Sequence, residues 1–173
     1  CEDPGFDTSL FRLICRIFTD GAACMRDFSS PDTLAMLQNA RRVNAEAHRV
    51  LQFMRFQKAA DGTYFGMMEP AYDVMPQAVE HFRDRFIIYD RSRQYGYSYA
   101  DNSLRRIRLP DAENFADGRL PDEIADADEK LFQKLWHTYF KAIAIPERRN
   151  PRKQCQDMPR RFWKYLTEKN FTR

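Results

Sequence analysis

The chain has 173 residues, of which 43% are hydrophobic and 31% charged, and its formal net charge is +3. This composition excludes a disordered chain and is typical of one globular domain, long enough to bury a core. No apolar run approaches the roughly 20 residues of a membrane span, and no signal-peptide pattern occurs, so we expect a cytoplasmic protein without membrane contact. The chain starts at Cys1 within sequence that looks ordered, which predicts a further segment upstream.

Helical patterns dominate the first third of the chain. Residues 6–18 form an apolar-rich helix candidate that Asp20-Gly21 can end. Ser30-Pro31 is a good helix start, because serine caps a helix and proline fits its first turn. Apolar residues then recur at three- and four-residue spacing, which predicts a long helix over residues 32–58. Asp61-Gly62 predicts the turn that follows this helix.

The middle of the chain changes from helical patterns to strand patterns. Glu69-Pro70 ends the first expected strand, and Asp101-Asn102 suits a two-residue hairpin turn between the last two. The expected strands cover residues 63–68, 86–90, 94–99 and 103–109, with a short helix over residues 76–83 between the first two. This order predicts a β-α-β-β-β unit that forms a small, mostly antiparallel sheet.

Two further helices are expected towards the C-terminus. Residues 122–145 predict a strong helix that Pro146 ends, and residues 159–167 predict a shorter one. Together these elements predict the α+β class, with several helices packed on the small sheet. We expect a single domain over residues 1–173, which divides into a helical part (1–60), a sheet part (61–110) and a C-terminal helical part (111–173).

Cysteine and histidine spacing gives no indication of a metal site. None of the four cysteines lies in a C-x-x-C pair, and the three histidines form no known metal motif. The cysteines are typical of free cytosolic thiols. Walker A, G-x-G-x-x-G and G-x-S-x-G motifs are also missing. We therefore expect no metal and no cofactor, and the motifs alone indicate no reaction.

The C-terminal segment carries the clearest functional signal. From residue 145 to residue 173 there are nine Lys and Arg residues against three Asp and Glu residues. Guanidinium groups beside the aromatic cluster Phe162, Trp163 and Tyr165 suit a phosphate backbone with unstacked bases. The alternative is that the aromatic side chains are core and the cations decorate a packed loop–helix hairpin. The cationic candidates are Arg148, Arg149, Arg152, Lys153, Arg160, Arg161 and Lys164.

Charge is distributed unevenly along the chain. Residues 110–130 hold eight Asp and Glu residues against two Lys and Arg residues, whereas the tail that follows is strongly basic. The acidic stretch can face the tail, or both can face solvent. Alternatively, the basic surface stays free for a polyanion and the acidic stretch is a spacer.

The expected hairpin predicts a second candidate surface. If Asp101-Asn102 is the turn, one sheet face carries three tyrosines interleaved with two arginines, and such a face can stack bases and hold phosphates. Alternatively the tyrosines are core and the arginines extend past them to solvent, and a slip of one residue in register would destroy the pattern. The expected cross-strand pairs are Tyr99 with Leu104, Tyr97 with Arg106, and Tyr95 with Arg108.

Two histidines are candidates for acid–base chemistry. His48 lines up with Arg41 and Arg55 at seven-residue spacing along one flank of the long helix, which is either a solvated edge or a cationic ridge for phosphate. His81 is either a structural hydrogen-bonding residue or a proton-transfer group that pairs with a nearby carboxylate. The candidate catalytic residues are Glu46, His48, His81 and Asp90, provided that they converge in a cleft.

Four stretches of the chain resemble a bacterial family of unknown function that is linked to DNA metabolism. They read EAHRVLQFMRFQ (46–57), EPAYDVMPQAVEHFRDRF (69–86), IIYDRSRQYGY (87–97) and KAIAIPERRNPRKQCQDMPRRFWKYL (141–166). Family members occur beside a radical-SAM protein of DNA modification or repair, and some are fused to a uracil-DNA glycosylase domain. The resemblance implies a role associated with DNA, but it supplies no reaction and no catalytic residues. Members also usually carry more sequence upstream.

Three functions stay open on this basis. The leading one is a DNA-binding accessory to base repair or modification. The second is an enzyme acting on a nucleotide or damaged base through a His/carboxylate/Arg pocket, which convergence of His48, His81 and Asp90 would favour. The third is a docking module for a uracil-DNA glycosylase or radical-SAM partner, in which the cationic segment pairs with an acidic protein surface.

Overall fold

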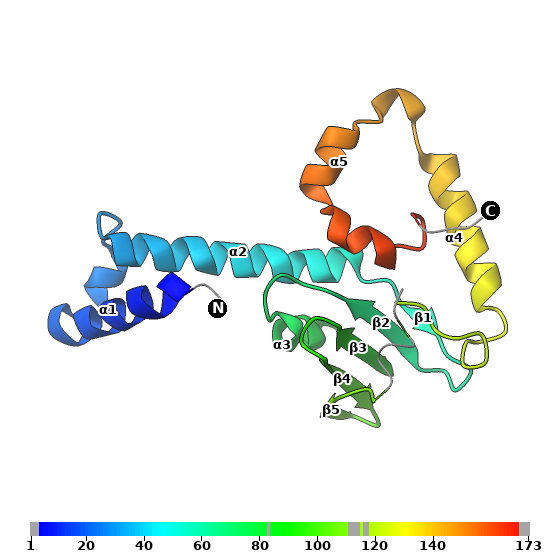
Figure 1. Cartoon of the computed structure of the whole chain (residues 1–173), viewed down its shortest axis with the longest axis horizontal. Coiled ribbons are helices and arrows are strands. Elements are labelled where there is room, and N and C mark those ends of the chain that lie inside the picture. The colour runs from blue at the N-terminus through cyan, green and yellow to red at the C-terminus, as the bar shows by residue number, and fades with distance from the viewer. Residues whose placement is uncertain (1–3, 83, 111–114, 116–117, 170–173) are drawn as a thin grey trace.

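The computed structural model describes residues 4–82, 84–110, 115 and 118–169. These residues form several helices and one five-stranded sheet, which confirms the expected α+β class. Figure 1 shows that α1 (Pro4–Asp20) lies along the first half of α2 (Pro31–Phe53), away from the sheet, while the end of α2 reaches the sheet. Helices α4 (Glu129–Ile143) and α5 (Pro151–Asp157) form an arch on the other side of the molecule, and the chain then returns to the end of α2 (Figure 1).

The sheet has the strand order β1-β2-β3-β4-β5. Its second and third strands are parallel and its other neighbours are antiparallel, because α3 carries the chain back between β2 and β3. This connection confirms the expected β-α-β-β-β unit. The strands are β1 (Gln57–Lys58), β2 (Tyr64–Met68), β3 (Phe86–Asp90), β4 (Tyr95–Ala100) and β5 (Ser103–Ile107); α3 spans Met75–Ala78 and continues as the 3₁₀ turn η2 (Val79–His81).

The β4–β5 hairpin turns at Asp101 and Asn102, as predicted. Both residues have positive φ angles, 50° and 57°, which a two-residue type I′ turn requires. The pairs Tyr99 with Leu104 and Tyr97 with Arg106 are confirmed. The ladder ends where Gly96 pairs with Ile107, one residue before the expected pair of Tyr95 with Arg108.

The N-terminal helices are α1 (Pro4–Asp20), the 3₁₀ turn η1 (Ala22–Arg26) and α2 (Pro31–Phe53). Ser30 is the N-cap residue of α2 and Pro31 is its first residue, as expected, although the serine side chain makes no capping hydrogen bond. The prediction that this helix continues to residue 58 is wrong. The backbone leaves the helical region at Met54. β1 pairs with β2 instead, because this pairing satisfies the backbone hydrogen-bonding groups of β1.

The C-terminal helices differ more from expectation. Helix α4 spans Glu129–Ile143, so the predicted start at residue 122 is wrong. The preceding residues pair with the β1 region instead: Ala125 forms a bridge with Ala59, and the Asp126 N–H donates to the Lys58 carbonyl at 2.9 Å. The structure also contains η4 (Pro146–Arg148), the unpredicted helix α5 (Pro151–Asp157) and, in place of the last expected α-helix, the 3₁₀ turn η5 (Arg160–Tyr165).

Alternate residues of the central strands face two hydrophobic clusters, as the two-residue period of a strand requires. Phe86 and Ile88 face the cluster formed with α2 and α3, whereas Tyr89 faces the second cluster. Turn η5 contributes Phe162 to the first cluster and Tyr165 to the second. The C-terminal segment is therefore part of the core, and this burial positions the charged residues around it.

Candidate functional site

The buried carboxylate Glu46 binds the C-terminal turn to helix α2. Its side chain is 1% exposed, and both of its oxygens accept from the Arg161 guanidinium, at 2.6 and 2.8 Å. The Ala71 N–H also donates to Glu46, at 2.7 Å, and Arg49 donates at 3.2 Å. Burial favours a higher pKa for Glu46, but these donors outweigh it and hold the pKa below its ordinary value. Glu46 is therefore a paired carboxylate.

The network continues through Ala71 to the end of strand β3. The Arg93 guanidinium donates to the Ala71 carbonyl at 3.1 Å and to Asp90 at 2.9 Å. Asp90 is the last residue of β3 and is fully buried, and this burial raises its pKa despite the arginine. Because β2 and β3 are parallel, their carboxyl ends lie at the same end of the sheet. Glu46 and Asp90, two of the catalytic candidates, thus belong to one network.

A second ion pair lies at the same end of the sheet, beyond the carboxyl end of β2. Glu69, which follows β2, accepts from the Lys164 ammonium at 2.6 Å and from Arg91 at 3.3 Å. Burial favours a higher pKa for Glu69, but the pairing with Lys164 lowers it below its ordinary value. A pocket of about 410 Å³ lies beside the two pairs, lined by Glu69, Pro70, Ala71, Ser92, Arg93 and Arg161. This pocket is polar and could hold a small charged ligand.

A third buried carboxylate, Glu168, joins the end of α2 to helix α4. Arg55 donates to both of its oxygens, at 2.7 and 3.3 Å, and the Trp136 indole N–H donates at 3.0 Å. Burial favours a higher pKa for Glu168, but Arg55 and Trp136 outweigh it and lower the pKa. Arg55, predicted to align with Arg41 and His48 as either a solvated edge or a cationic ridge, follows the end of α2 and is engaged in a structural pair.

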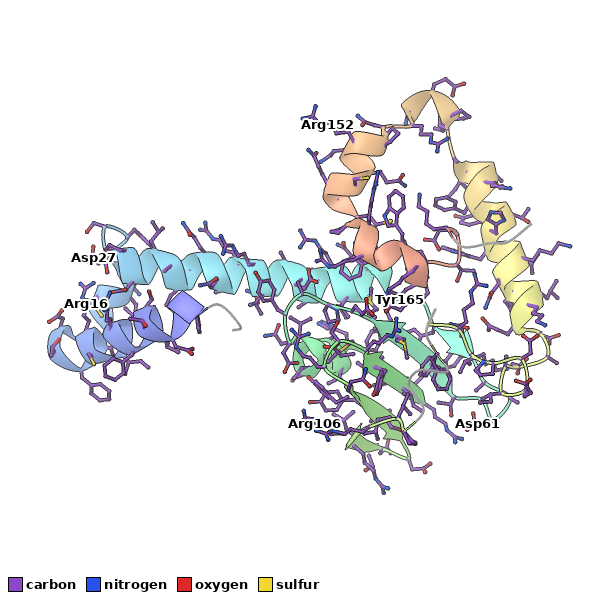
Figure 2. All side chains as sticks on the ribbon, in the orientation of Figure 1. Arg16, Asp27, Asp61, Arg106, Arg152 and Tyr165 are labelled. Atoms are coloured by element: carbon purple, nitrogen blue, oxygen red, sulfur yellow. The ribbon has the colours of Figure 1, made fainter. Side chains whose placement is uncertain are left out.

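The segment from residue 144 to residue 160, here called the arm, carries exposed arginines. Lys153 pairs with Asp157 at 2.9 Å, whereas four arginines of the arm form no ion pair within the part of the chain that the structure describes. Figure 2 shows Arg152 on the arm, far from Arg106 on the sheet, so the two expected nucleic-acid surfaces are separate. The four arginines are Arg148, Arg149, Arg152 and Arg160.

The tyrosine face of β4 covers the core. Tyr95 is buried, and its hydroxyl donates to Asp73. Its ring lies under the Arg106 guanidinium, whose carbon is 4.2 Å from the ring centroid. Tyr97 and Tyr99 are partly buried against the same cluster. The ring of Tyr95 is therefore unavailable to a base, while Arg108 is exposed beyond the end of β5.

The two histidine candidates lie outside the network. His48 is exposed, because it follows Glu46 by two helical positions and therefore faces roughly the opposite side of α2. Its Nδ1 atom forms a hydrogen bond with the Asn44 carbonyl at 2.9 Å. His81 is exposed after α3, at the amino end of β3, whereas Asp90 ends that strand. Helical spacing alone could have separated His48 from Glu46. The part played by Arg93 was indicated only by its place in one of the family-like stretches.

The acidic stretch contributes local pairs. Within the described residues, Asp126 pairs with Lys58 at 3.0 Å and Asp122 with Lys130 at 2.6 Å, and neither pairs with the arm. Residues 111–114 and 116–117 lie outside the described residues, as does Cys1. Cys15, Cys24 and Cys155 are free thiols.

The described residues lack two further kinds of feature. They contain no group of three or more His, Cys, Asp or Glu side chains that could hold a metal ion. Among the helices of the described part, none combines the length and apolarity needed to cross a membrane.

Comparison with known proteins gives a family without a function. The family model for the domain of unknown function DUF4130 matches residues 4–168. The search of curated proteins found no match, and neither did the search of solved structures. Because this match states no activity, the expected link to DNA stays a prediction. The chain belongs to the DUF4130 family of domains of unknown function.

Proposed function

We propose that this protein binds nucleic acid through the arm and acts as an accessory to base repair or modification. The observation that carries the proposal is the group of four exposed arginines, Arg148, Arg149, Arg152 and Arg160, none of which has an ion-pair partner among the described residues. The resemblance to a family linked to DNA metabolism supports the same conclusion.

The division of the cations within the C-terminal segment supports this proposal. Arg161 and Lys164 pair with the buried or half-buried carboxylates Glu46 and Glu69, so these two cations anchor the segment. The arginines of the arm have a different environment, since all four are exposed to solvent. Arg160 also lies over the Trp163 ring, with its guanidinium carbon 5.7 Å from the ring centroid. Each guanidinium offers a planar fork of N–H donors that matches a phosphate. Binding a polyanion also releases counterions and relieves repulsion between neighbouring arginines.

A second candidate function is catalysis or nucleotide binding at a site beyond the carboxyl ends of β2 and β3. The observation in its favour is the polar pocket of about 410 Å³ beside Glu69, Arg93 and Arg161, close to a buried aspartate whose pKa is raised. Neither His48 nor His81 belongs to the network, which weakens the version of this hypothesis that uses a histidine. Binding of a mononucleotide that Arg93→Met abolishes would support this second function.

The proposed function is tested by fluorescence anisotropy with labelled single- and double-stranded DNA, with and without uracil, across a salt series. Arg148→Ala and Arg152→Ala should each weaken binding about equally for all sequences and lower the salt slope by about one unit. Arg12→Ala is the matched control, because Arg12 is an exposed arginine on α1, at the far end of α2 from the sheet.

Two results would contradict the proposal. If both arm variants keep the wild-type salt slope, the arm does not contact phosphate. If the wild-type protein does not bind DNA even at low salt, the docking module becomes the better hypothesis, and association with a glycosylase or radical-SAM partner is the next measurement.

A further inference from the structure

A large aromatic groove lies between helix α4 and the end of α2. Its volume is about 960 Å³, and its walls come from three parts of the chain that are distant in sequence. Residues from the end of α2 and from strands β1 and β2 form one side, and one face of α4 forms the other. Five aromatic side chains line it: Phe56, Tyr64, Phe132, Trp136 and Tyr139.

The aromatic rings of α4 are exposed, and Trp136 among them is held in place. Phe132 is 56% exposed, Tyr139 54% and Trp136 40%. The Trp136 and Tyr139 ring centroids are 5.8 Å apart with an interplanar angle of 35°. The Trp136 indole is fixed by its bond to Glu168, and the Arg55 guanidinium lies 5.7 Å from its ring centroid. Exposed rings on a fixed support provide flat faces for a planar ligand.

The chemistry of the groove favours bases over an aliphatic partner. Among the lining residues that the structure describes, five are aromatic and one, Leu135, is aliphatic. Gln52, Gln133 and Thr167 also line the groove, and their amides and hydroxyl can bond the edges of bases. Base–aromatic stacking tolerates any sequence, because every base has a π face.

Helix α4 connects the groove to the arm along the chain. Helix α4, which carries Trp136, leads directly into η4 and the arginines of the arm. From Trp136 to the end of α4 at Ile143 is about 10 Å, given the helical rise per residue. A strand whose bases enter the groove can therefore place neighbouring phosphates against the arm. This charge complementarity selects a polyanion as the occupant.

We propose that the groove holds unstacked bases of single-stranded nucleic acid whose phosphates contact the arm. The inference rests on the proposed function, since the arm supplies the phosphate contacts. It adds a strand preference, because the bases of a duplex are stacked inside and cannot reach Trp136 without unpairing.

The test uses intrinsic fluorescence and affinity together. The chain has two tryptophans, so Trp163→Phe leaves Trp136 as the reporter. Oligothymidylate should quench Trp136, and a matched duplex should quench it less. Tyr139→Ala and Phe132→Ala should lower the affinity for oligothymidylate by roughly 5- to 100-fold each, with the salt slope unchanged. Phe18→Ala is the matched control, because Phe18 is an exposed aromatic residue on α1.

The outcomes separate the groove from the arm. Salt-sensitive DNA binding without quenching, with Tyr139→Ala equal to wild type, overturns the groove and leaves the proposed function standing. Quenching that Tyr139→Ala removes supports the groove. If Trp163→Phe does not fold, the affinities of Tyr139→Ala and Phe132→Ala decide alone. Absence of binding to either form of DNA overturns both proposals, and a protein would then be the expected occupant.

Discussion

Replacing Arg161 with methionine should destabilise the fold substantially, because it leaves a buried carboxylate without its main partner. Glu46 is 1% exposed and receives two of its hydrogen bonds from Arg161. Breaking a fully buried pair costs about 3–5 kcal/mol. The Arg161 side chain is 38% exposed, and Glu46 keeps the Ala71 N–H and Arg49 as donors. We therefore expect a smaller loss in the free energy of unfolding, about 2–3 kcal/mol.

The effect of Arg161→Met should depend on pH with a defined sign. The folded-state pKa of Glu46 lies below its ordinary value of 4.5, so its pairing stabilises the fold above that pH. The contribution is lost as the pH falls through the folded-state pKa. Urea unfolding of the wild type and the variant should therefore show the largest difference near pH 7 and a shrinking difference below pH 4.5.

A matched control and a double-mutant cycle complete the experiment. Lys153→Met removes the exposed Lys153–Asp157 pair and should cost less than about 0.5 kcal/mol. Adding Glu46→Gln to the Arg161→Met chain removes the unpaired charge and should recover part of the loss. An Arg161→Met loss no larger than that of Lys153→Met, or one independent of pH, would refute the idea that this pair holds the C-terminal segment.

Three further changes should also destabilise the protein, as urea unfolding would measure. Gly96→Ala should lower the free energy of unfolding by about 3 kcal/mol, because an added Cβ would overlap the Ile88 carbonyl oxygen, a backbone atom that cannot rotate away. A loss under about 1 kcal/mol would mean that β3 and β4 separate easily. Asn102→Val should cost about 1–2 kcal/mol, because a β-branched residue is strained at a φ of 57°, and Asn102→Gly is the control that should not be destabilising. Glu168→Ala should cost about 1.5–3 kcal/mol, because Arg55 loses its charged acceptor; an unchanged midpoint would contradict a structural role for that pair.

The β4–β5 hairpin could be predicted from its local residues. Asp101 and Asn102 tolerate positive φ angles, and a two-residue turn sets the pairing of the strands that flank it. The pairs Tyr99 with Leu104 and Tyr97 with Arg106 follow from the turn alone, and both are confirmed. Which face of β4 meets the core depends on α2 and α3, and this contact decided that Tyr95 is buried.

Helix ends were predicted poorly where a distant strand competes for the backbone. Residues 54–58 and 122–128 both continue a helical pattern, yet β1 pairs with β2 instead. Residues 124–126 then bond the backbone of residues 58–60, through the bridge of Ala59 with Ala125 and its neighbouring hydrogen bonds. Helical spacing measures local preference, and long-range pairing of backbone groups can override it.

The sequence by itself determined the β-α-β-β-β order, the hairpin register and the concentration of arginines near the C-terminus, since each depends on residues close together in the chain. Only the tertiary structure decided how those arginines divide between anchoring and exposure. Arg161 meets Glu46 across 115 positions of sequence, and Arg55 meets Glu168 across 113. A spacing pattern identifies which residues share a face, but the partner of that face is chosen by packing, because packing buries the carboxylate and leaves it dependent on a cation from a distant part of the chain.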